Sequence, residues 1–96
     1  MKRYIKSAVN PWKTKYEVHW ISPDGKDCLL GGSNNELEAN QIARNQARQI
    51  FESPFETPER KVHFLDTIYI IENGTEYDAM TSETEASIEY LISKLQ

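Results

Sequence analysis

The sequence is short of the residues that build most metal sites and covalent cross-links. It contains one cysteine, Cys28, and two histidines among 96 residues. A single cysteine excludes an intramolecular disulfide and a zinc site made from several cysteines. A small domain without disulfides suits a reducing compartment, so we expect a cytoplasmic protein. We also expect no cofactor and no metal.

Long apolar runs are lacking as well. No stretch approaches the ~20 apolar residues with which a helix crosses a bilayer, so we expect no membrane partner. The chain begins with the basic sequence MKRYIK, and no apolar segment of the kind found in secretory signals follows it. A glycine-rich phosphate loop is absent too, because Gly31-Gly32 lacks the spaced glycines and the lysine of that motif.

The charge is modest but uneven. The net charge is −4. The first sixteen residues carry only basic charges, whereas residues 72–96 carry six acids against Lys94 alone. Such asymmetry is typical of a basic arm for nucleic acid or of an acidic face for a basic partner. Two solvated chain ends that attract each other weakly would produce the same pattern.

The composition is that of a small folded domain, since hydrophobic residues make up 39% and aromatic residues 10% of the chain. We expect one domain over residues 1–96. Alternating apolar residues predict a strand over Tyr16–Ile21, and Pro23-Asp24-Gly25 predicts a three-residue hairpin loop. Pairing Ser22 with Lys26 across this loop places Trp20 opposite Cys28 and Val18 opposite Leu30, with Leu29 beside His19.

A helix is predicted after this hairpin. Either Ser33 with Glu36 or Asn35 with Glu38 has the spacing of an N-terminal capping box. The predicted buried stripe recurs at intervals of three and four residues and consists of Ala39, Ile42, Ala43, Ala47, Ile50 and Phe51. The other face holds polar residues, among them Asn40, Arg44 and Arg48, and Pro54 ends the helix.

The second half shows a similar order of elements. Residues 62–72 predict a long strand that is apolar on both faces. Asn73-Gly74 predicts a type I′ turn, which pairs Ile70 with Tyr77 and Ile68 with Ala79. A final helix is expected from Thr81 or Ser82, with a buried stripe of Ile88, Leu91, Ile92 and Leu95.

Together these patterns predict an α+β fold, a ββα-ββα pseudo-repeat with halves at about 14–53 and 62–96. The expected architecture is an antiparallel sheet of four to five strands with two helices on one face. Residues 1–13 would form an edge strand or an arm.

Few residues suggest chemistry. His19 and His63 could form a metal or acid–base pair, but two surface histidines in separate strands explain them as well. Cys28 could be a nucleophile, although its predicted position in the hairpin favours inert packing. Asp66 interrupts an apolar strand face, which predicts either a functional carboxylate or a bend. We therefore predict that the protein is not an enzyme.

The main functional prediction is a small protein-binding or regulatory module. The sheet face away from the helices would carry an apolar patch, and self-association through it is the most specific form of the prediction. The predicted interaction surface consists of His19, Leu29, Leu65, Tyr69 and Ile71.

Two alternatives remain open. One is contact with nucleic acid through basic and aromatic residues of the N-terminal segment, namely Lys2, Arg3, Lys6, Trp12, Lys13 and Lys15. The other is a small inhibitor that presents its acidic C-terminal half to a basic partner.

Overall fold

A computed structural model describes residues 14–74 and 78–96, and in these ranges it contains three strands and three helices. Their order is β1 (Tyr16–Ile21), β2 (Asp27–Ser33), α1 (Glu36–Glu52), α2 (Pro58–Thr67), β3 (Tyr69–Glu72) and α3 (Ser82–Leu95). The strands form an antiparallel sheet in the order β2-β1-β3. The α+β class is thus confirmed.

The β1–β2 hairpin forms at the predicted turn. Ser22 N–H donates to the Lys26 carbonyl at 2.8 Å, and Gly25 adopts a φ of 87°, a backbone conformation that glycine tolerates best. Trp20 pairs with Cys28 and His19 with Leu29, as predicted. A register shift between Val18 and His19 then places Gly31, and not Leu30, opposite Val18. The extra residue of this irregularity was not visible in the alternating pattern.

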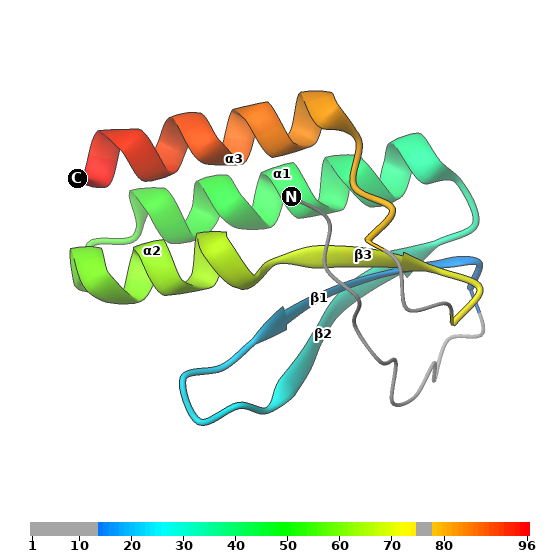
Figure 1. The fold of residues 1–96 in the computed structure, drawn as a ribbon, viewed down its shortest axis with the longest axis horizontal. Coiled ribbons are helices and arrows are strands. Elements are labelled where there is room, and N and C mark those ends of the chain that lie inside the picture. The colour runs from blue at the N-terminus through cyan, green and yellow to red at the C-terminus, as the bar shows by residue number, and fades with distance from the viewer. Residues whose placement is uncertain (1–13, 75–77) are drawn as a thin grey trace.

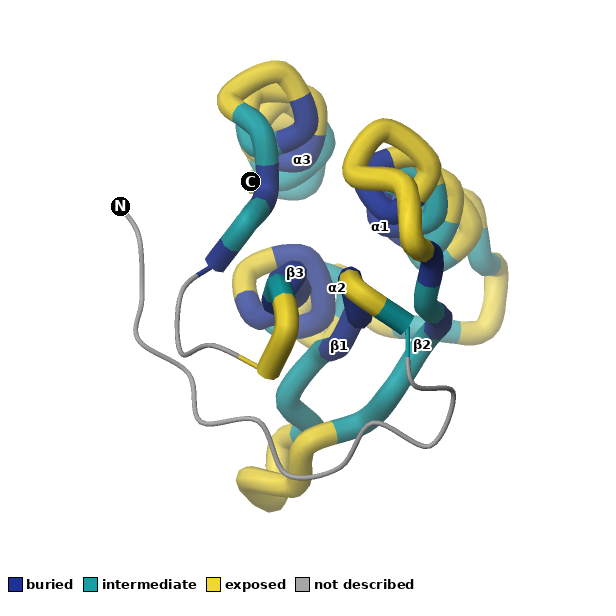
Figure 2. Tube along the Cα trace, turned by 90° about the vertical axis from the view of Figure 1, so that its right-hand side faces the viewer, coloured by how far each residue is buried: buried dark blue, intermediate teal, exposed yellow. Residues whose placement is uncertain are grey.

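The helices α1 and α3 lie side by side over one face of the sheet, and α2 leads directly into β3 (Figure 1). The core fills the space between the helix layer and the sheet (Figure 2). It contains Val18 and Ile70 from the sheet, Ala39, Ala43 and Ala47 from α1, Phe64 and Leu65 from α2, and Ile88 from α3. Of the predicted stripes, Ala39, Ala43, Ala47 and Ile88 are buried in this core. The others that pack against it are only partly buried, namely Ile42, Ile50, Leu91, Ile92 and Leu95.

The predicted strand over residues 62–72 is wrong in its first half, which is the helix α2. Thr57 caps this helix by accepting the Arg60 N–H at 3.3 Å. Pro58 occupies the first turn, where a backbone N–H has no partner within the helix, so the N–H that proline lacks is not needed. Only β3 remains as a strand, so the described sheet has three strands and not four or five. The third helix also breaks the ββα-ββα pseudo-repeat and the two-helix arrangement.

The second predicted hairpin is incomplete in the described residues. Asn73 and Gly74 have φ angles of 52° and 70°, as a type I′ turn requires, but residues 78–80 form no strand. The Asp78 side chain instead accepts the backbone N–H groups of Ile70 and Met80, each at 3.0 Å. Tyr77, the predicted partner of Ile70, lies outside the described residues, and so does the predicted edge strand or arm over 1–13.

None of the described helices is both long enough and apolar enough to cross a membrane.

Candidate functional site

The predicted interaction surface is only partly assembled. His19, Tyr69 and Ile71 share the sheet face opposite α1 and α3, but their side chains are buried there, with His19 only 2% exposed. Leu29 lies beside His19 and is half-buried. Leu65 belongs to α2 and packs in the core, so it is not part of this face.

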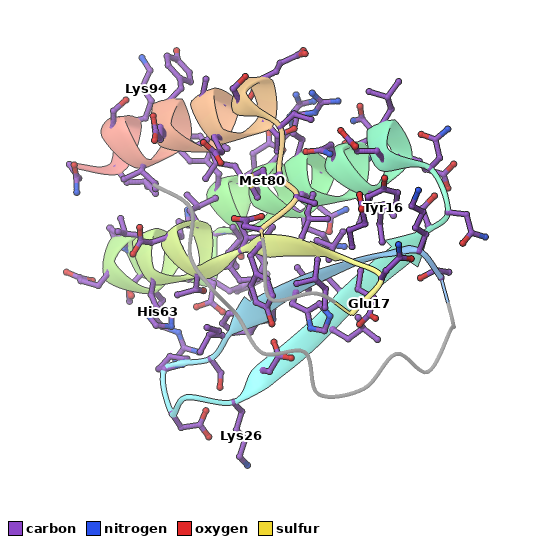
Figure 3. The ribbon with its side chains drawn as sticks, turned by 45° about the vertical axis from the view of Figure 1, so that its right-hand side comes forward. Tyr16, Glu17, Lys26, His63, Met80 and Lys94 are labelled. Atoms are coloured by element: carbon purple, nitrogen blue, oxygen red, sulfur yellow. The ribbon has the colours of Figure 1, made fainter. Side chains whose placement is uncertain are left out.

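A polar network replaces the predicted apolar patch. His19 Nε2 lies 2.8 Å from Glu17 Oε1, and His19 Nδ1 lies 3.0 Å from Asp27 Oδ2. The Tyr69 hydroxyl donates to Asp27 Oδ1 at 2.5 Å, and the Tyr69 ring stacks on the imidazole with 5.2 Å between centroids. Figure 3 shows Glu17 on the opposite side of the sheet from its neighbour Tyr16. Period-two alternation places these polar groups on one face.

The hydrogen bonds of this network require an extra proton. A carboxylate oxygen only accepts, and each ring nitrogen of His19 faces a carboxyl group. Either both nitrogens carry hydrogen, or one carboxyl group is protonated and donates to the ring. Glu17 is 1% exposed, and its Oε2 has no hydrogen-bond partner within the described part of the chain. The network is therefore internally paired except at this one oxygen.

Its geometry does not resemble an open catalytic or metal site. Both imidazole nitrogens are engaged with carboxyl groups, and no group of three or more His, Cys, Asp or Glu in residues 14–74 and 78–96 could hold a metal ion. His63 lies on α2, where its Nε2 donates to the Ile21 carbonyl at 2.8 Å. The predicted strand positions of His63 and Asp66 are thus wrong, and Asp66 is exposed on α2.

Two other predicted residues can be placed. Cys28 is half-buried in β2, and its thiol points to the Lys26 carbonyl at 3.7 Å. Lys15 is exposed, and its ammonium group lies 5.5 Å from the centroid of the Tyr16 ring. The remaining residues predicted to contact nucleic acid, Lys2, Arg3, Lys6, Trp12 and Lys13, lie outside the described residues.

The surface with the shape of a binding site lies elsewhere, between α1 and α3. A groove of about 530 Å³ runs between these helices, and small or apolar side chains line most of it. Its lining consists of Arg44, Ala47 and Arg48 from α1 and of Glu83, Ala86, Ser87, Ile88, Tyr90 and Leu91 from α3. We call this feature the α1–α3 groove. Its volume falls within the range typical of ligand pockets.

The two walls of the α1–α3 groove differ in chemistry. The α1 wall is basic through Arg44 and Arg48, whereas the α3 wall carries Glu83 and the aromatic Tyr90. Arg44 Nη1 lies 3.5 Å from Glu83 Oε1 across the groove, and Tyr90 is 60% exposed. A large exposed aromatic beside small residues is a feature that protein-binding surfaces favour, because it supplies contact area at low entropic cost.

A second hollow, of about 260 Å³, lies between α2 and α3 and is acidic at its rim. Four of its lining residues carry carboxyl groups, namely Asp66, Asp78, Glu85 and Glu89, around an apolar floor that includes Leu65 and Ile88. Of these acids, Asp78 is occupied with backbone N–H groups.

Sequence reasoning missed the α1–α3 groove because it placed Arg44 and Arg48 on a solvated face and read Ala47 as core. A signal did exist. Ala47 belongs to the buried stripe of α1, and Ala86 and Ser87 lie beside the stripe of α3. Small side chains between neighbouring helices leave a depression.

Comparisons with protein-family models, with curated proteins and with solved structures find no match for this chain.

Proposed function

We propose that this protein is a small, non-enzymatic protein-binding module and that the α1–α3 groove is its binding surface. The observation that carries the proposal is the combination of an open groove with small and apolar lining and an exposed aromatic, Tyr90, on its wall. An amphipathic helix or extended segment fits such a groove when it presents apolar anchors to the floor.

The burial of the polar network supports binding over catalysis at the sheet. A general acid or base must come within hydrogen-bond reach of a substrate, directly or through one water. His19 and Glu17 are 2% and 1% exposed, and their inner contacts are to each other and to Asp27. In this arrangement the network orders the hairpin against β3, while the groove remains accessible.

Selection from a peptide display library tests the proposal. The wild-type protein is immobilised at low density, and selected peptides are compared with a groove variant, Ala86→Glu, and a control, Gln49→Glu. Both positions are exposed on helices, but only Ala86 lines the groove. We expect peptides that bind the wild type and Gln49→Glu and bind Ala86→Glu at least about tenfold more weakly, as for loss of a central contact.

Peptides that bind all three proteins equally would contradict the proposal, as would a failure to select any binder. Circular dichroism of both variants serves as the folding control. A helical signal equal to that of the wild type attributes a loss of binding to the groove itself.

The acidic hollow between α2 and α3 favours a second candidate function, the presentation of the acidic C-terminal half to a basic partner. Its carboxyl groups surround an apolar floor, and this arrangement suits a lysine or arginine side chain with its apolar stem. Glu89→Lys would then weaken binding of basic peptides, whereas Glu52→Lys, at an exposed acid of α1, would not. Equal effects of the two charge reversals on peptide affinity would exclude this hollow as the binding site for a basic partner.

A further inference from the structure

We infer that the occupant of the α1–α3 groove is a second copy of this chain, which docks its own α1–α3 surface face to face about a twofold axis along the groove. This inference rests on the proposed binding function of the groove and names its partner. It also moves the predicted self-association from the sheet face to the helix layer.

The two groove walls carry different charges. The α1 wall carries Arg44 and Arg48, and the α3 wall carries Glu83 and Tyr90. A twofold interface brings the same patch of both copies together, so the patch must complement itself. A surface with a basic wall beside an acidic and aromatic wall is complementary to itself for only one direction of the twofold axis.

The orientation of the axis decides which walls meet. A twofold axis across the groove would place the α1 walls opposite each other, with arginine facing arginine. An axis along the groove exchanges the walls, so that Arg44 and Arg48 of one copy face the α3 wall of the other. Each copy then offers Glu83 to an arginine and Tyr90 to a guanidinium group, which stacks well on aromatic rings.

The positions of Arg44 and Glu83 along their helices are also consistent with a twofold axis along the groove. Figure 1 shows α1 and α3 running in the same direction, from their N-terminal ends at the right to their C-terminal ends at the left. Arg44 contacts Glu83 within one chain, so these residues lie at one level of the groove. A twofold axis along the groove preserves that level, and Arg44 of one copy meets Glu83 of the other. Arg48, one turn further along α1, then lies toward Tyr90.

The floor permits a close approach of the two copies. Ala86 and Ser87 are exposed on α3 between Glu83 and Tyr90, and Ala47 lies at the base of the α1 wall. Small residues let helices approach closely, so the exposed Tyr90 of one copy can cover apolar surface of the other. Burial of this ring supplies apolar contact, while the charged residues fix the orientation.

Sedimentation equilibrium of charge-reversed variants tests the inference. Wild-type protein is expected to show a reversible monomer–dimer equilibrium. Arg44→Glu alone leaves both walls acidic at this level, and Glu83→Lys alone leaves both walls basic. For each single variant we expect a dimer dissociation constant at least about tenfold larger than that of the wild type. Both variants should fold, because an ion pair at the surface contributes little to stability.

An equimolar mixture of the two variants is the decisive sample. In a mixed dimer, the reversed position 44 of one copy faces the reversed position 83 of the other, and the two unchanged residues face each other. We expect the mixture to dimerise more tightly than either variant alone, with a dissociation constant approaching that of the wild type. Asn45→Glu, an exposed change on α1 that does not line the groove, should leave the wild-type equilibrium unaltered.

A monomeric wild type up to millimolar concentration would overturn the inference. So would a dimer that both single reversals leave intact, because its interface would lie on another surface. Neither result would disturb the peptide selection described above, since a monomer whose groove binds a foreign segment retains the proposed function.

Discussion

The carboxamide oxygen of Asn40 on α1 accepts the backbone N–H of Thr81, the N-cap residue of α3, at 2.9 Å. Asn40 is 1% exposed, and its amide nitrogen donates to the Glu36 carbonyl at 2.9 Å. One buried side chain of α1 thus fixes where α3 begins. The relative position of the two helices, and therefore the shape of the groove between them, depends on this contact.

Replacing Asn40 with alanine should destabilise the fold by about 1–3 kcal/mol, because the half-buried Thr81 N–H loses its partner. Urea unfolding followed by circular dichroism measures the loss. Asn45→Ala is the matched control, since Asn45 is exposed on the same helix, and its effect should stay within about 0.5 kcal/mol. Equal effects of the two substitutions would show that Asn40 does not anchor α3.

The polar network predicts an asymmetry between two substitutions. His19→Leu removes the group that pairs both carboxyl groups and should cost about 3 kcal/mol or more, because the buried Glu17 carboxyl group remains without its partner. Glu17→Gln keeps an acceptor for the ring and removes a buried carboxyl group whose second oxygen has no hydrogen-bond partner among residues 14–74 and 78–96. Its cost should be clearly smaller. Urea unfolding monitored by tryptophan fluorescence compares them, and a larger cost for Glu17→Gln would refute the pairing scheme.

Alkaline pH should weaken the fold through Tyr16. Burial raises the pKa of Tyr16 from 10.0 to about 12, and the carboxylates of Glu72 and Glu36 act in the same direction. A group whose pKa is higher in the folded state stabilises fully below its unfolded pKa and loses that contribution as pH rises through the folded pKa. Wild-type stability should therefore fall between pH 10 and about 12.

Tyr16→Phe isolates this contribution, since it removes the hydroxyl and keeps the ring. The difference in unfolding free energy between wild type and Tyr16→Phe should shrink as pH rises from 10 to about 12. A difference that stays constant over this range would contradict the raised pKa.

Gly31 of β2 packs closely against Ile42 of α1, so substitutions at these two positions should have non-additive effects on stability. A methyl group at Gly31 would lie 3.1 Å from Ile42 Cγ2, which is tighter than ordinary packing. The β-branched Ile42 has little rotamer freedom in a helix, so Gly31→Ala should cost about 1–3 kcal/mol. In a double-mutant cycle, Ile42→Ala should cost less in the Gly31→Ala background than in the wild type. Additive costs would show that the two positions do not meet.

Much of the first half of the fold was predictable from local patterns. The β1–β2 turn, the pairing of Trp20 with Cys28 and the buried alanines of α1 follow from turn chemistry and periodicity. The turn at Asn73-Gly74 and the stripe of α3 were also predictable. In these segments the local preference and the tertiary environment agree, which is the condition under which sequence patterns succeed.

The helix α2 was not predicted because its apolar residues fit two periods. Val62, Phe64 and Ile68 alternate as in a strand, whereas Phe64 and Leu65 together with Ile68 also suit a helix and the turn that ends it. The start signal was present in Thr57-Pro58, a capping residue followed by proline in the first turn.

The polar contacts could not be predicted because they depend on partners far along the chain. Glu17 and His19 alternate with apolar residues along β1, as exposed residues of a strand do. Their burial is compensated by contacts with each other and with Asp27 and Tyr69. Asn40 looks like a surface residue for the same reason. Its partner, Thr81, is 41 residues away.

The central claim is that the α1–α3 groove is the surface through which this protein binds protein. Its most direct test is a ¹H–¹⁵N correlation spectrum of labelled protein, recorded during titration with unlabelled protein and with a peptide selected for groove binding. The largest shift changes should occur at groove residues, with Arg44, Arg48, Ser87 and Tyr90 among them, and the β1–β2 turn should be unaffected. Largest changes on the hairpin or on α2, or no changes in either titration, would contradict it.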